Sequence, residues 1–128
     1  MHTFRSLSLA LLAVPAFFAS AAAFAHPKLV SSTPADKAEV SAPATVELAF
    51  SETLMPQMSG ADVVMTSMPG MPGMGAMKVG ARASVSDDAK TLIVTPLRPL
   101  APGAYRADWH VVSTDTHAVK GTLTFSVK

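Results

Sequence analysis

His26 follows a sequence that a signal peptidase would cleave, and cleavage there would place metal-binding chemistry at a new chain end. Residues 23–25, Ala-Phe-Ala, have the Ala-x-Ala pattern of a cleavage site. Cleavage after Ala25 would leave His26 first, with its α-amine and imidazole able to chelate one metal ion together. Both groups lose a proton readily, because an α-amine titrates at about 7.7–8.0 and an imidazole at about 6.5. The nitrogen of Pro27 carries no hydrogen, so it cannot ionise and become a further ligand. The alternative for His26 is a solvated side chain at an arbitrary cut.

Asp115 and His117 are the second candidate for metal binding. Residues two apart in an extended chain face the same side, so both side chains could converge on one ion. Imidazole suits Cu(II), and the affinity of first-row divalent ions peaks at copper. The amine and imidazole of His26, the imidazole of His117 and an oxygen of Asp115 would satisfy the tetragonal preference of Cu(II). An Asp-x-His pair alone is usually a loop feature, so its weight depends on His26.

A methionine-rich run is the third candidate. Its methionines recur every three residues, at Met65, Met68, Met71, Met74 and Met77. The intervening prolines and glycines exclude an amphipathic helix. Polyproline II, with three residues per turn, would align the thioethers along one edge. The chain has no cysteine, so a site for a soft metal must use thioethers and imidazoles, and thioethers select Cu(I). For Met65, which lies in a predicted strand, core packing is an equal alternative.

Other residues are weaker candidates. His110 lies on the polar face of its predicted strand, where a solvated histidine is the favoured interpretation. Glu52 is either an acidic neighbour of the metal site or a charge at a strand end. Met55 and Met58 stand apart from the methionine run and are predicted to be packing residues. Trp109 is predicted to be a core aromatic residue.

The elements that must position these residues are short and alternating. The clearest is 103–112, where four apolar residues face one side and Arg106, Asp108 and His110 face the other. Predicted strands cover residues 28–31, 45–50, 61–66, 78–85, 91–95, 103–112 and 122–127. About seven strands with turn residues between them predict an all-β sandwich or barrel. No part of 26–128 is long, periodic and proline-free enough to predict a helix.

Residues 1–25 are predicted to be a cleaved signal peptide, and residues 26–128 one β domain. Arg5 supplies the positive start, and residues 7–18 the apolar centre. A membrane anchor is the alternative, but the Ala-rich end favours cleavage. No second long apolar run follows, so the mature chain is expected to be soluble. The net charge is only +1, which gives no indication of a nucleic-acid partner.

No catalytic constellation is apparent in the sequence. It has neither a cysteine nor a Gly-x-Ser-x-Gly nucleophile motif, and no His-Glu-x-x-His. It also has no glycine motif of the kind that cradles phosphate. The sequence therefore predicts a protein that is not an enzyme.

Together these residues resemble the CopC/PcoC family of periplasmic copper-resistance proteins. The resemblance spans the whole of 26–128. It includes the opening His-Pro-Lys-Leu-Val-Ser-Ser-Thr-Pro of 26–34, Phe50-Ser51-Glu52, the methionine run of 65–71, Trp109-x-x-Val112-Ser113-x-Asp115-x-His117 and Gly121-x-x-Thr124-Phe125.

The resemblance implies a Greek-key β-barrel or sandwich, immunoglobulin- or cupredoxin-like, with copper sites at opposite ends. It implies Cu(II) ligands at His26, Asp115 and His117, with Glu52 at a position that is sometimes included. It implies Cu(I) ligands at Met65, Met68 and Met71. Family members often have a histidine soon after the third methionine, but here Pro72-Gly73-Met74 follows. A thioether-only Cu(I) site is therefore expected, to which Cu(II) does not bridge.

The leading interpretation is a periplasmic, non-enzymatic copper carrier or sequestering protein that acts in copper resistance or homeostasis. The resemblance suggests exchange of copper with a membrane copper-transport protein or other periplasmic copper proteins. One alternative is a copper-dependent oxidative enzyme acting on polysaccharides, whose copper site also starts with an N-terminal histidine. That enzyme would need exposed aromatic residues, whereas the one tryptophan and one tyrosine are predicted to face inward. Another alternative is a metal-independent β-sandwich interaction module, whose melting temperature would not respond to copper.

Overall fold

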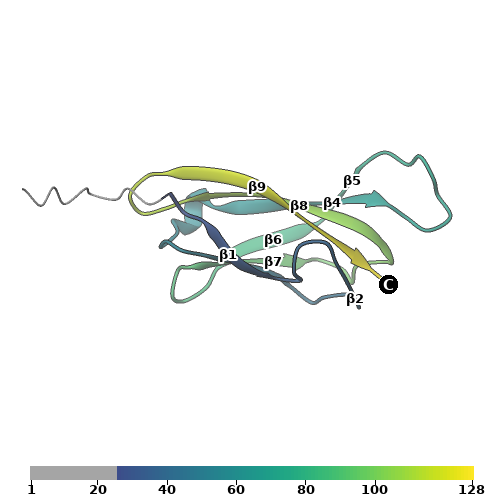
Figure 1. The fold of residues 1–128 in the computed structure, drawn as a ribbon, viewed down its shortest axis with the longest axis horizontal. Helices are drawn as coiled ribbons and strands as arrows, with labels where there is room; N and C mark the ends of the chain where they lie inside the picture. Colours follow the sequence, from purple (N-terminus) through teal and green to yellow (C-terminus); the bar gives the residue numbers. More distant parts are fainter. Residues whose placement is uncertain (1–25) are drawn as a thin grey trace, which may run out of the picture.

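The computed structural model describes residues 26–128, and the predicted signal peptide, 1–25, lies outside the described residues. Nine strands form two facing sheets, which confirms the predicted all-β sandwich (Figure 1). Within 26–128 the only helical element is one 3₁₀ turn, η1 (Pro56–Met58). No helix in this part of the chain has the length and apolar character needed to cross a membrane.

Both sheets are built mainly from antiparallel neighbours. The first has the order β1 (Leu29–Thr33), β3 (Val46–Phe50), β7 (Thr91–Pro96), β6 (Ala81–Val85). The second has the order β2 (Ala38–Val40), β9 (Ala118–Val127), β8 (Gly103–Val112), β4 (Gly60–Ser67), β5 (Met77–Val79). Only β2 runs parallel to its neighbour, β9, among the strand pairs of 26–128.

The core lies between the sheets and follows the alternation of the sequence. In β8 every second residue from Gly103 to Val111 is buried, and in β3 Val46, Leu48 and Phe50 are buried, as predicted. Trp109 is also a core residue, as predicted, and packs edge-to-face on Phe50 of the opposite sheet, with ring centroids 5.1 Å apart. This contact joins the two sheets near the end of β3.

The prediction of a single strand over 78–85 is wrong. The chain forms β5 up to Val79 and β6 from Ala81, and these strands belong to different sheets. The change of sheet occurs at Gly80, where an added Cβ would lie 3.1 Å from Cδ1 of Leu97. The short strand β2 was not predicted either, and together with the division of 78–85 it gives the sandwich nine strands rather than about seven.

The two ends of the sandwich carry different loops. At one end β1 begins and the β8–β9 hairpin turns, while the loop from β4 to β5 protrudes at the other end (Figure 1). The candidate histidines therefore lie at one end of the long axis, and the methionine run lies at the opposite end.

Candidate metal sites

His26 and His117 meet at the end where the β8–β9 hairpin turns. Their ring centroids are 4.8 Å apart and their planes cross at 64°, an edge-to-face contact. The neighbouring Pro27 is buried, which fixes the chain next to the exposed His26. Lys28 is held to Ser51 by two hydrogen bonds, from the Lys28 amide to Ser51 Oγ at 3.0 Å and from the Ser51 amide to the Lys28 carbonyl at 2.9 Å.

Asp115 and His117 also lie together, but in a tight turn rather than in the extended chain expected from their spacing. Thr116 has a φ of +72°, and its amide donates to the carbonyl of Ser113 at 2.8 Å. The carboxylate Oδ2 of Asp115 lies 3.0 Å from Nδ1 of His117. The buried hydroxyl of Ser113 donates to Oδ1 of Asp115. The Ser113 hydroxyl, helped by His117, lowers the pKa of Asp115 below its ordinary value, so the carboxyl is ionised at neutral pH.

His26, Asp115 and His117 together are called the histidine cluster. The segment that follows β3 connects its two parts, the start of the domain at His26 and the turn at 113–117. Ser51 is bonded to the first residues of the domain, as above, and the carbonyl of Thr53 accepts from the amide of Thr114 at 3.0 Å. Leu54 forms an isolated β-bridge with Ser113. Glu52 lies between Ser51 and Thr53 and is half-buried. Its place in the chain is therefore next to both halves of the histidine cluster.

The donor set is incomplete while the chain is uncleaved. Within 26–128, no three His, Cys, Asp or Glu side chains are arranged so that they could hold a metal ion. His117 contacts His26 on one side and Asp115 on the other, and the backbone nitrogen of His26 is part of a peptide bond until the chain is cleaved. Cleavage after Ala25 would convert that nitrogen into an amine and add a third nitrogen donor. Such a nitrogen-rich set with one carboxylate suits Cu(II).

The methionine loop at the other end is made of β-turns, so the expected polyproline II conformation is wrong. The amide of Met71 donates to the carbonyl of Met68 at 3.1 Å. Gly70 and Gly73 have φ values of +78° and +77°. A Pro-Gly pair with positive φ at the glycine is typical of a type II turn, whereas polyproline II needs a φ of about −75° throughout.

The five methionines of the run differ in burial. Met65 is 6% exposed and belongs to the core, whereas Met71 and Met77 are 53% and 57% exposed. Met68 and Met74 are partly buried against the core. Met65 and Met77 are direct partners in the β4–β5 pair, and Met68 and Met71 form a β-bridge. The backbone pairing thus brings four of the five methionines together two by two.

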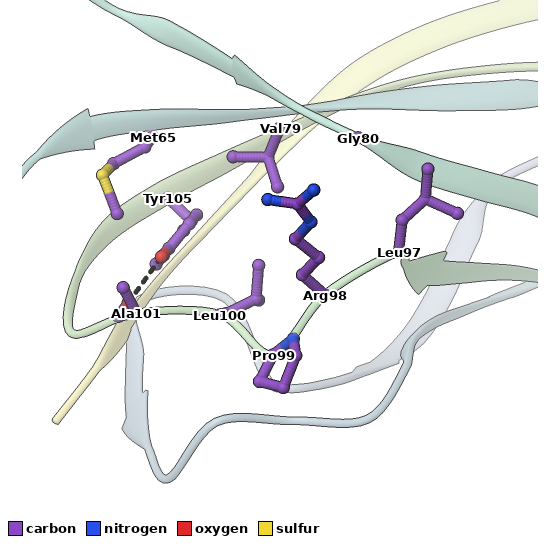
Figure 2. Close-up of a pocket in the computed structure, with 9 residues that line it drawn as sticks. All are labelled: Met65, Val79, Gly80, Leu97, Arg98, Pro99, Leu100, Ala101 and Tyr105. Carbon is purple, nitrogen blue, oxygen red and sulfur yellow. Dashed lines mark hydrogen bonds between the residues drawn. The ribbon is translucent and has the colours of Figure 1, made fainter.

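A groove of about 440 Å³ opens next to Met65, and no sequence pattern predicts it. Met65 and Tyr105 line one side, and the 97–101 segment lines the other (Figure 2). The hydroxyl of Tyr105 donates to the carbonyl of Ala101, which ties the segment to β8. The side chain of Arg98 extends across the groove toward Val79 (Figure 2). Met65 is therefore both a core residue and part of the groove wall.

The remaining candidates lie outside both clusters. His110 is exposed on the outer face of β8, as predicted, and its ring is so close to Gly60 that an added Cβ there would lie 3.1 Å from Cε1. Met58 is 52% exposed, so the prediction that it is a packing residue is wrong; Met55 is partly buried. Met58 belongs to the η1 turn, in which no residue is buried.

Ser113 and Ser51 help to hold the residues of the histidine end in place, and neither was predicted to do so from the sequence. Ser113 was part of the motif quoted above, but nothing in its spacing shows that its hydroxyl is buried and directed at Asp115. Ser51 likewise gains its importance only from pairing with Lys28 across two segments.

Comparison with known proteins identifies the family of the chain. A family model described as "CopC domain" matches residues 29–128. "Copper resistance protein C" of Xanthomonas campestris pv. juglandis is 58% identical over 128 residues, which is 100% of both chains. The crystal structure of PcoC, a copper resistance protein from Escherichia coli, has a TM-score of 0.76 and 42% sequence identity, and the match covers 79% of this chain and 99% of that one.

A more distant relative is longer. "Copper transport protein CutJ" of Bacillus subtilis (strain 168) is 31% identical over 106 residues, which is 81% of this chain but only 18% of the relative. The matches to the family model and to the full-length relative cover nearly all of 26–128. The chain belongs to the CopC family.

Proposed function

We propose that the protein is exported to the periplasm, is cleaved after Ala25 and binds copper there in the service of copper resistance or homeostasis. The observation that carries this proposal is the contact between the rings of His26 and His117, 4.8 Å apart. The names of the relatives support copper as the metal, because they are called copper resistance proteins.

In this proposal Cu(II) is held at the histidine end. The amine and imidazole of His26 chelate the ion, and His117 supplies a second imidazole. Asp115 supplies a carboxylate, which is already ionised because hydrogen bonds lower its pKa. Glu52 is the outermost candidate, since only its position in the chain places it near the cluster.

Cu(I) is held by the methionine loop at the other end of the sandwich. Met71 and Met77 are exposed enough to meet an incoming ion, while Met68 and Met74 are partly buried beside them. Met65 extends the site toward the core. Thioethers are soft ligands and favour Cu(I), so the two ends would select different oxidation states.

A carrier role follows from this separation, because oxidation weakens binding at thioethers and reduction weakens binding at imidazoles. A membrane copper-transport protein is the proposed exchange partner. The support is that a similar segment makes up 18% of a protein named a copper transport protein. Other periplasmic copper proteins are a second class of partner.

A binding role is favoured over the oxidative enzyme by the position of the aromatic residues. Trp109 and Tyr105 are 8% and 2% exposed, and they are the one tryptophan and one tyrosine of the chain. Neither can present a flat ring to a polysaccharide.

The test compares the mature protein with a form that has one extra residue before His26. The extension turns the α-amine into an amide and leaves every side chain in place. Loss of a direct ligand should cost more than loss of an outer-shell partner, so Cu(II) affinity should fall at least about 100-fold. Mass spectrometry of the exported protein establishes the first residue. Equal Cu(II) affinity of the two forms, or a different first residue, would contradict the proposal.

A further inference from the structure

Apart from the aromatic residues Tyr105 and Trp109, Ser113 is the only side chain with a polar group that is buried among residues 26–128, with 1% exposure. It lies directly after β8, at the first position of the turn that holds Asp115 and His117. Its hydroxyl donates to Oδ1 of Asp115, and the same oxygen lies 3.3 Å from the carbonyl oxygen of His117. A buried hydroxyl without a partner would be costly, so these bonds hold the Ser113 side chain in one orientation.

The carboxylate of Asp115, held by Ser113, in turn restricts the orientation of the His117 imidazole. Its Oδ1 accepts from the Ser113 hydroxyl and, at 3.4 Å, from the amide of His117. Its Oδ2 lies 3.0 Å from Nδ1 of His117. A carboxylate has about four acceptor positions, so these contacts leave room for Asp115 to bind a metal as well. The contact at Nδ1 fixes the plane of the ring and keeps the imidazole next to the carboxylate.

The turn itself does not depend on this hydroxyl. The amide of Ser113 donates to the carbonyl of His117 at 3.0 Å, and the amide of Thr116 donates to the carbonyl of Ser113 at 2.8 Å. A third backbone bond, from Thr114 to Thr53 at 3.0 Å, fastens the turn to the segment after β3. Removing the hydroxyl should therefore release the carboxylate while the backbone keeps its course.

We propose that Ser113 is a positioning residue for the Cu(II) site, because its buried hydroxyl holds the Asp115 carboxylate against Nδ1 of His117. This inference depends on the proposed function, in which His117 binds Cu(II). Ser113 itself does not touch the metal. Its contribution is that the Asp115 carboxylate and the His117 imidazole are already side by side when the ion arrives.

The first experiment measures Cu(II) affinity of the mature Ser113→Ala variant by competition with a chelator. Outer-shell partners of metal ligands typically contribute about 10–100-fold to affinity, and a loss in this range is expected. The paramagnetic resonance spectrum should change, since the plane of the imidazole is no longer fixed. Thr114→Ala is the matched control: it removes a neighbouring hydroxyl that is exposed and makes no side-chain hydrogen bond among the described residues. It should bind Cu(II) as the wild type does.

A double-mutant cycle then separates positioning from a purely structural role. If Ser113 acts through Asp115, Ser113→Ala should cost nothing further in an Asp115→Ala background. An equal loss in both backgrounds would overturn the proposal. A Ser113→Ala variant that fails to fold would also overturn it, because the three backbone hydrogen bonds should suffice to form the turn. Wild-type affinity in Ser113→Ala together with a large loss in His117→Ala would refute this inference alone, whereas unchanged binding in His117→Ala would refute the proposed function.

Discussion

The imidazole of His26 touches the imidazole of His117 edge-to-face, although one residue opens the described chain and the other lies near its end. The contact is possible because the segment after β3 is hydrogen-bonded both to the chain next to His26 and to the turn that holds His117. Ser51 holds Lys28, and Thr53 holds Thr114, so both histidines are fastened to the same short stretch of chain. The two imidazoles proposed as Cu(II) ligands are thus already close together in the metal-free chain, which would reduce the conformational entropy that binding must overcome.

Replacing His117 by alanine should remove Cu(II) binding of the mature protein almost entirely. The variant loses one of two imidazoles and leaves Asp115 without its ring partner. We expect a fall in Cu(II) affinity of at least about 100-fold, measured by chelator competition. His110→Ala is the matched control, because His110 is exposed on the outer face of β8 and lies against Gly60. A comparable loss in His110→Ala would mean that Cu(II) binds elsewhere on the sandwich.

Acidification should release Cu(II) by protonating the nitrogen ligands and not Asp115. The Ser113 hydroxyl lowers the pKa of Asp115, so its carboxylate form is favoured in the folded state. Its stabilising effect is present above the unfolded value of about 3.9 and is lost only as pH falls through the lower folded value. Between about pH 5 and 7 Asp115 therefore does not titrate, while metal binding still releases protons from amine and imidazole.

The measurement is Cu(II) affinity against pH for the wild type and Asp115→Asn. The variant should bind more weakly at each pH, with a parallel slope between about pH 5 and 7. A flatter slope in Asp115→Asn would show that the carboxylate takes up a proton in this range.

Gly121 should be intolerant of any side chain. An added Cβ would lie 2.4 Å from Cζ2 of Trp109, and a rigid indole packed on Phe50 cannot yield easily. Gly121→Ala should lower the free energy of unfolding by about 1–3 kcal/mol, as overpacked cores do. Urea denaturation of the metal-free protein gives this value. Gly75→Ala is the control, since nothing lies within 4 Å of an added Cβ there, and stability lost equally in both variants would refute the steric explanation.

The strands were predictable where one face is buried and the other is not. The bounds 103–112 agree with β8 because alternation there continues for ten residues, with no proline and no glycine after the first residue, Gly103. The segment 78–85 alternates too, but a local pattern does not say which sheet a strand joins, and the chain changes sheet at Gly80. The short strand β2 has too few residues to show any period.

The candidate site was predictable in its residue types and less so in its geometry. Imidazole and thioether chemistry can be read from His26, His117 and the methionine run. Whether Pro-Gly repeats form turns or polyproline II depends on the φ of Gly70 and Gly73, and both conformations favour the same residues. The hydroxyl of Ser113 acquires its partner only when the turn closes, so no spacing rule identifies it.

The methionine loop should lose Cu(I) affinity without losing stability when an exposed thioether is replaced. Met71→Leu keeps the size of the side chain and removes the sulfur, and Met71 is 53% exposed, so the free energy of unfolding should change by less than about 0.5 kcal/mol. Cu(I) affinity, measured with a Cu(I)-selective chelator, should fall at least about tenfold. Met58→Leu is a closely matched control, because Met58 is 52% exposed but belongs to η1, outside the loop.

The same substitution at Met65 tests how far the thioether site reaches into the core. Met65→Leu conserves volume and should cost less than about 1.5 kcal/mol, whereas Met65→Ala leaves a cavity and should cost about 2–5 kcal/mol. If the buried thioether takes part in binding, Met65→Leu lowers Cu(I) affinity although the core stays filled. If affinity is unchanged in Met65→Leu, Met65 serves the core alone and the Cu(I) ligands are confined to the loop and Met77.

For the Met71 prediction, a loss of Cu(I) affinity in Met58→Leu equal to that in Met71→Leu would show that Cu(I) binds exposed thioethers whether or not they belong to the loop.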